Sequence, residues 1–247
     1  MDSLKGIISD VHTFLYGGMT TLPLTIAGTM LILGLFTANY AILFFLIGYL
    51  IGVPIVSTLL NFIVSLIFTP GVKYNIFGYL FGNPFEGMDS DICKVVQSSG
   101  KNVNAGKPII QFASPWLSMV TFFLGYILTN ALKLYSMTTI DGAITVKTEG
   151  SDVTNKVSNR KTQALIALIS IAVFALAVMA FRMYTSCDSG LSVLLGAGAF
   201  GTAGYYWYQL LSLVGQDRLS DLFGIANRLL PPSAIENKPI ACVPIPN

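Results

Sequence analysis

Charged side chains are scarce in this chain, and long parts of it contain none. Asp, Glu, Lys and Arg make up 11% of the residues, whereas about a quarter of the residues are charged in an ordinary soluble domain. Four segments carry no charged residue at all: 11–72, 108–132, 162–181 and 189–216. A charge at the centre of a bilayer costs about 2.5–3.5 kcal/mol on insertion scales, so segments built for hydrocarbon exclude it. This absence, with a mean hydropathy of +0.69, predicts an integral membrane protein.

Residues that perform catalysis or bind metals are also few. The chain has a single histidine, His12, and three widely spaced cysteines that form no C-x-x-C pair. Zinc sites combine Cys and His at short spacings, and acid–base catalysis needs titratable groups, so both are disfavoured. The net charge of +2 is spread along the chain, whereas nucleic-acid binding requires a basic cluster. We therefore predict no catalytic, metal-binding or cofactor-binding residues, no enzyme activity and no nucleic-acid partner.

What the chain does have is a series of apolar segments long enough to cross a bilayer, which takes roughly 20 residues each. We predict an all-α polytopic membrane protein with about five transmembrane helices and amphipathic surface helices at both ends. Residues 1–18 place apolar side chains at spacings of three and four, which predicts an interfacial helix. The spans are expected as a hairpin at 19–68, a third span at 113–132, and spans four and five at 164–215.

Pro54 lies in the middle of the second apolar stretch, 40–68. Proline has no backbone N–H, and its ring clashes with the preceding turn of a helix. This stretch is also longer than the hydrocarbon core of a bilayer requires. We therefore predict a kink at Pro54.

Polar residues gather in three segments outside the spans. Residues 69–112 are predicted to be a polar loop. Residues 133–163 are predicted to be a second polar loop, with a β-hairpin around Asp141-Gly142, because Asp-Gly favours the tight turns of hairpins. Residues 216–247 combine an amphipathic segment with an extended, proline-rich tail.

The tail, 231–247, holds five prolines and cannot form a helix. Its apolar residues Ile240, Val243 and Ile245 would gain nothing from exposure to water, whereas burial would stabilise them. An extended apolar segment of this kind can dock on another protein as an added strand. We therefore expect these three residues to contact a partner outside the membrane.

The five-span prediction also places the cysteines. Cys93 and Cys187 fall on one side of the membrane, and Cys242 falls on the other. A disulfide needs two cysteines on the same side, in an oxidising compartment. Cys93 and Cys187 are therefore the candidate disulfide.

The string Gly196-Ala197-Gly198-Ala199-Phe200-Gly201 has two interpretations. It fits the dinucleotide-binding pattern G-x-G-x-x-G, which works only between a strand and a helix of a βαβ unit. In a membrane helix, small residues instead allow two backbones to approach closely. We favour the second interpretation because apolar helical segments precede the string. The predicted packing face consists of Ala197, Gly198, Gly201 and Gly204.

The stretch G-L-F-T-A-N-Y-A-I-L-F-F-L-I-G-Y-L-I-G-V-P at 34–54, together with the order of spans, resembles motif-poor multi-span structural proteins in the membranes of large DNA viruses. The resemblance implies a non-enzymatic structural or assembly role in the inner membrane of a virion. We expect the partners to be the lipid bilayer, other membrane or capsid proteins, and further copies of the chain in an oligomer.

The alternative function is a small channel or transporter subunit. It would need polar side chains of the spans, such as Ser57, Asn61, Ser118 and Thr121, to line one continuous path. Such residues more often bond a neighbouring helix or their own backbone. The sequence therefore favours the structural role.

Overall fold

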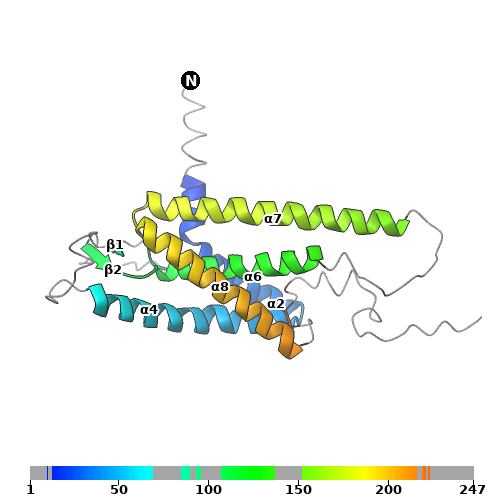
Figure 1. Ribbon diagram of the computed structural model, residues 1–247, viewed down its shortest axis with the longest axis horizontal. Helices are drawn as coiled ribbons and strands as arrows, with labels where there is room; N and C mark the ends of the chain where they lie inside the picture. The colour runs from blue at the N-terminus through cyan, green and yellow to red at the C-terminus, as the bar shows by residue number, and fades with distance from the viewer. Residues whose placement is uncertain are drawn as a thin grey trace, which may run out of the picture.

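The structure is a computed structural model, which describes residues 10, 13–68, 85–89, 93–95, 107–136, 152–215, 219–220 and 222. The described part is mainly a bundle of helices, with a small two-stranded sheet at one end (Figure 1). The elements, in chain order, are α2 (Leu22–Phe36), α3 (Tyr40–Ile47), the π-helix η1 (Gly48–Gly52), α4 (Val53–Phe68), β1 (Glu86–Asp89), β2 (Lys107–Ile110), α6 (Pro115–Ser136), α7 (Asp152–Tyr184) and α8 (Gly190–Gly215).

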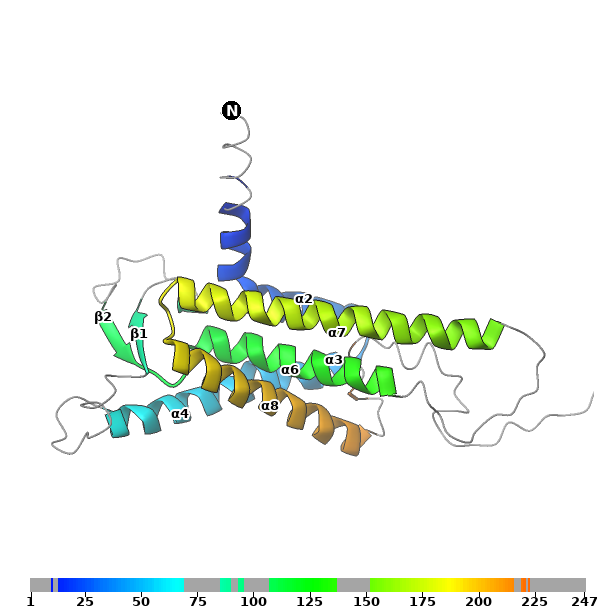
Figure 2. The ribbon, with the colours of Figure 1, turned by 45° about the horizontal axis from the view of Figure 1, so that its top comes forward.

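Helix α6 is the centre of the bundle. It contacts α2, α4, α7 and α8, and Figure 2 shows it between α7 and α8. Within its apolar stretch 61% of the residues are buried, against 39% for Tyr40–Ile67 and 11% for Thr162–Tyr184. The fully buried side chains of α6 are Trp116, Leu117, Ser118, Val120 and Tyr126. Helix α7, by contrast, leaves most of its apolar surface open.

A tight turn at residues 37–39 joins α2 to α3, inside the hairpin expected at 19–68. Ala38 adopts a positive φ of 48°. Asn39 caps α3, because its side-chain oxygen accepts a hydrogen bond from the backbone N–H of Ala41 at 3.0 Å. Its Nδ2 donates to the carbonyl oxygen of Leu222 at 3.1 Å, which ties this turn to the segment after α8.

The irregularity next to Pro54 is a π-helical turn. Pro54 is the second residue of α4, which follows η1 directly. Within this turn the N–H of Val53 donates to the carbonyl oxygen of Gly48, five residues earlier. This wider turn gives room for the proline ring, which would clash with the carbonyl of Leu50 in a regular helix. The helix continues through it, so Tyr40–Ile67 is a single candidate span of 28 residues.

Three helices among the described residues are long and apolar enough to cross a membrane: Tyr40–Ile67, Pro115–Lys133 and Thr162–Tyr184. A fourth is added if Thr13–Thr20 and Leu22–Phe36, which meet at a bend of 67°, form one span. Helix α8 is not among them, because its many glycines and polar residues lower its hydropathy. The count is therefore three to four, and the predicted five is not confirmed.

The polar segments differ from the prediction in one described place. Within 69–112, strands β1 and β2 pair antiparallel, with Glu86 opposite Ile110 and Asp89 opposite Lys107. The predicted loop therefore contains a small sheet, and the fold is mostly, not wholly, helical. The hairpin at Asp141-Gly142, most of the two amphipathic end segments, and the tail with Cys242 lie outside the described residues. So do the docking residues Ile240, Val243 and Ile245.

Candidate functional site

Two oppositely charged side chains are buried together where α7 turns into α8. Arg182 lies in the last turn of α7, and Asp188 lies in the connection to α8. Arg182 Nε donates to Asp188 Oδ2 at 2.9 Å, and both side chains are 0% exposed. Taking one such ion out of water costs several kcal/mol, so each charge depends on the other. A pair that meets only where the chain turns between two helices leaves no periodic signal in the sequence.

Ser114 connects this ion pair to the start of α6. Its backbone N–H donates to Asp188 Oδ1 at 2.7 Å, and its hydroxyl donates to Asp188 Oδ2 at 2.8 Å. The same hydroxyl oxygen accepts from Arg182 Nη2 at 2.7 Å and from the N–H of Leu117 at 3.2 Å. Ser114 thus caps α6, and the carboxylate of Asp188 lies at the positive end of that helix dipole.

Trp116 covers the guanidinium of Arg182. The Arg182 Cζ atom lies 4.8 Å from the centre of the indole ring, which is a cation–π contact. The indole Nε1 donates to the carbonyl oxygen of Thr20 at 3.1 Å. This bond ties the ion pair to the residues that precede α2. Three segments that are distant in sequence therefore meet at this point: Thr20, the start of α6 and the turn from α7 to α8.

A disulfide closes the same end of the bundle. Cys93 and Cys187, the candidate pair from the sequence, are bonded with their Cα atoms 5.4 Å apart. Gln111 Nε2 donates to the carbonyl oxygen of Cys187 at 3.0 Å, and the N–H of Met88 donates to Ser186 O at 3.2 Å. The α7–α8 turn is therefore held against the small sheet. We call Ser114, Arg182 and Asp188, together with this disulfide, the clamp.

Gly87 of β1 is required for this contact. A Cβ atom at Gly87 would overlap with the carbonyl oxygen of Cys187. A backbone carbonyl cannot swing aside as a flexible side chain can, so the strand and the turn approach closely only because residue 87 has no side chain.

The polar residues that a channel would need are bonded inside the bundle. Ser57 and Ser118 hydroxyls lie 3.3 Å apart, and Thr121 donates to the carbonyl of Leu117 at 2.7 Å. Asn61 accepts from the N–H of Phe112 at 2.7 Å and donates to Ala113 O at 3.1 Å. Ser57 joins α4 to α6, and Asn61 joins α4 to the residues just before α6. Thr121 bonds a carbonyl oxygen of its own helix.

Helices α6 and α8 pack along glycines. A Cβ atom at Gly204 would overlap with the carbonyl of Phe122, and one at Gly125 would overlap with the backbone of Gly201. The buried positions of α8 are Ser192, Val193, Gly196, Phe200, Gly204, Tyr208 and Leu211.

The predicted packing face therefore needs a correction. Gly201 and Gly204 lie at the contact with α6, and Ala197 is half-buried beside it. Gly198 is exposed, and nothing lies within 4 Å of a Cβ placed there. It is about 120° around the helix from Gly204, since each residue turns an α-helix by about 100°.

Gly204→Ala is expected to lower the free energy of unfolding by about 1–3 kcal/mol, because the added methyl meets backbone atoms that cannot move aside. Gly198→Ala is the matched control and is expected to be neutral or slightly stabilising, because alanine favours the helix and space is open. Thermal and chemical unfolding of the detergent-solubilised variants measures the difference. Equal stabilities for the two variants would refute this packing contact.

The string Gly196–Gly201 lies wholly inside α8. Residues 191–195, which a dinucleotide site would need as a strand, belong to the first turns of the same helix. The dinucleotide interpretation is therefore wrong. In the part of the chain that the structure describes, no three His, Cys, Asp or Glu residues gather as metal ligands would.

Comparisons of the chain with protein-family models, with curated proteins and with solved structures find no match. No relative therefore indicates the class of this protein, and we infer the class from the structure. Its three to four helices that are long and apolar enough to cross a membrane are those of an integral membrane protein with a helical bundle. One end of that bundle is closed by the clamp.

Proposed function

We propose that the protein is a non-enzymatic structural component of a membrane, which holds other proteins in an assembly. The clamp is the observation that carries this proposal. Its buried charges, Arg182 and Asp188, bond each other and Ser114. A catalytic or ion-conducting group must face a substrate or a path, whereas both of these side chains are 0% exposed. Their role is to fix α6, α7 and α8 relative to one another.

The uneven burial of the helices supports the same role. Helix α6 is enclosed by its neighbours, while the apolar surfaces of α4 and α7 are largely open. A rigid bundle with open apolar faces can contact lipid and other membrane helices at the same time. The large exposed apolar side chains of α4 include Ile55, Leu59, Phe62, Ile63 and Leu66.

The resemblance of residues 34–54 to structural membrane proteins of large DNA viruses also suggests where the protein is located. We assign the assembly to the inner membrane of a large DNA virus, beneath a capsid. The tail residues Ile240, Val243 and Ile245 then make the contact with a protein outside the bilayer. A small channel or transporter subunit is the competing function.

The test replaces Ile240, Val243 and Ile245 together by serine. The described bundle ends before the tail, so thermal stability in detergent is expected to stay unchanged while co-purification of partner proteins from the native membrane is lost. Serine at Glu236, Asn237 and Lys238 is the matched control, which is expected to keep the partners. If the triple variant retains every partner at normal stoichiometry, the docking role of the tail is wrong. Solute flux through liposomes that contain only the purified chain would instead support the channel.

A further inference from the structure

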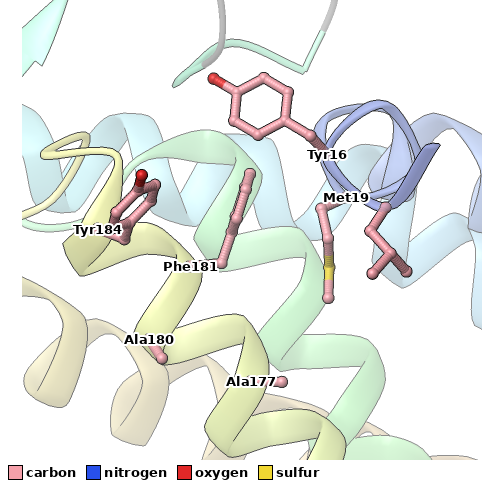
Figure 3. A pocket seen from close by; sticks show the side chains of 7 residues that line it. Tyr16, Met19, Ala177, Ala180, Phe181 and Tyr184 are labelled. Carbon is pink, nitrogen blue, oxygen red and sulfur yellow. The ribbon is translucent and has the colours of Figure 1, made fainter. Parts of the chain in front are cut away.

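An open apolar groove lies between the N-terminal helix, residues 13–20, and α7. Its volume is about 360 Å³, which falls in the range of small-molecule pockets. Figure 3 shows side chains of the two helices facing each other across it. The lining residues are Leu15, Tyr16, Met19, Ala177, Ala180, Phe181 and Tyr184.

The groove exists because of a bend and two small residues. The helix at 13–20 meets α2 at 67°, so it leaves the bundle across α7 instead of packing along it (Figure 1). Ala177 and Ala180 present only methyl groups, which leaves the space open. The rings of Tyr16 and Phe181, which both line the groove, meet edge to face with centroids 5.7 Å apart.

The groove is lined by apolar and aromatic side chains, two of which are tyrosines. In Figure 3 the hydroxyls of Tyr16 and Tyr184 point away from Ala177 and Ala180. Tyrosines favour the headgroup level of a bilayer, where the ring is in the apolar layer and the hydroxyl is wet. Ala177 lies about 10 Å deeper along α7 than Tyr184, at 1.5 Å per residue. The groove therefore runs from headgroup level into the hydrocarbon.

The groove is continuous with a surface that lipid must cover. Ile166 and Val173 lie on the same helical face as Ala177 and Ala180, further along the candidate span Thr162–Tyr184, and both are exposed. Arg182, which is adjacent in sequence, is fully buried by the clamp and offers no charge to the groove. The side chains that line it are apolar or aromatic.

We propose that this groove binds one acyl chain of a membrane phospholipid, with the lipid headgroup at Tyr16 and Tyr184. An open, apolar groove with two tyrosines among its lining residues fits a chain that enters from the headgroup level. A lipid held there wedges the N-terminal helix at its angle to α7 and exchanges more slowly than the lipid around the rest of the bundle. This site is independent of the structural role proposed above.

A tryptophan near the groove, Trp116, can report on its occupancy by fluorescence. Phe181 lines the groove and lies against Trp116, with ring centroids 6.2 Å apart. Trp116 is fully buried, so lipid around the bundle does not touch it. The chain has two tryptophans. Trp207→Phe therefore leaves Trp116 as the single fluorophore.

The experiment reconstitutes the Trp207→Phe protein in phosphatidylcholine vesicles that contain a rising fraction of phosphatidylcholine with brominated acyl chains. Bromine quenches indole only at short range. Trp116 emission is expected to fall and to saturate at a low fraction of brominated lipid. Adding Ala180→Leu, which fills the groove, is expected to reduce that quenching at least several-fold. Ala172→Leu is the control, because Ala172 is an exposed residue of α7 away from the groove.

Three results would overturn the proposal. The first is equal quenching in the Ala180→Leu and Ala172→Leu proteins when both show the thermal stability of the parent. The second is quenching that is relieved by added cholesterol but not by unlabelled phosphatidylcholine, which would assign the groove to a sterol. The third is absence of quenching together with cross-linking of a Tyr184→Cys protein to a second protein chain, which would assign it to a partner helix.

Discussion

Asp188→Ala is expected to lower the free energy of unfolding by about 3–5 kcal/mol, the largest effect of any single substitution considered. The change leaves the guanidinium of Arg182 buried without the carboxylate that it faces at 2.9 Å, and an uncompensated buried charge is strongly destabilising. It also removes the acceptor for the N–H of Ser114 at the start of α6. Chemical unfolding in detergent, followed by circular dichroism, measures the loss.

The double variant Arg182→Met, Asp188→Leu is the control for this result. It removes both charges and keeps apolar volume, and replacements of that kind are often close to neutral. The double variant is therefore expected to be more stable than Asp188→Ala, and the non-additivity measures the coupling of the pair. If the single variant loses less than about 1 kcal/mol, water reaches Arg182 and the pair is not buried as described.

Removing the Cys93–Cys187 disulfide by the double alanine variant is expected to cost about 2–5 kcal/mol. The two residues are 94 positions apart, and closing a loop of roughly 100 residues stabilises a protein by about 4–5 kcal/mol in the chain-entropy estimate. Unfolding of the oxidised protein, with and without a reductant, gives the same comparison without mutation. Cys242→Ala is the matched control and is expected to change nothing. A reductant effect that persists in the double variant would show that the loss has another origin.

The apolar helices could be predicted from the sequence, because exclusion of charge acts on each segment by itself. Helices α6 and α8 lie within a few residues of the apolar segments 113–132 and 191–215, although only α6 is among the helices long and apolar enough to cross a membrane. The turn at 37–39 was also predictable, since Asn39 is a good helix cap. Local chemistry was sufficient in these cases.

Within the clamp, the candidate disulfide was visible in the sequence, whereas the buried ion pair and its bonds to Ser114 were not, because those bonds join distant segments. Ser114 and Asp188 are 74 residues apart, and nothing local to either indicates the other. Strand β1 has the sequence E-G-M-D, which is polar and has little strand preference, and it forms only by pairing with β2. On α8, a spacing of three at Gly198, Gly201 and Gly204 suggested a face, whereas the buried row follows a spacing of four through Phe200, Gly204 and Tyr208.

The disulfide also limits how many times the chain between its two cysteines can cross the bilayer. Two bonded sulfur atoms are on the same side of a membrane, so the polypeptide between Cys93 and Cys187 crosses it an even number of times. Among the described residues of that interval, the candidate spans are Pro115–Lys133 and Thr162–Tyr184, which is an even number. The bond can form only after the chain has been made as far as Cys187, in a compartment that is oxidising enough to keep it closed.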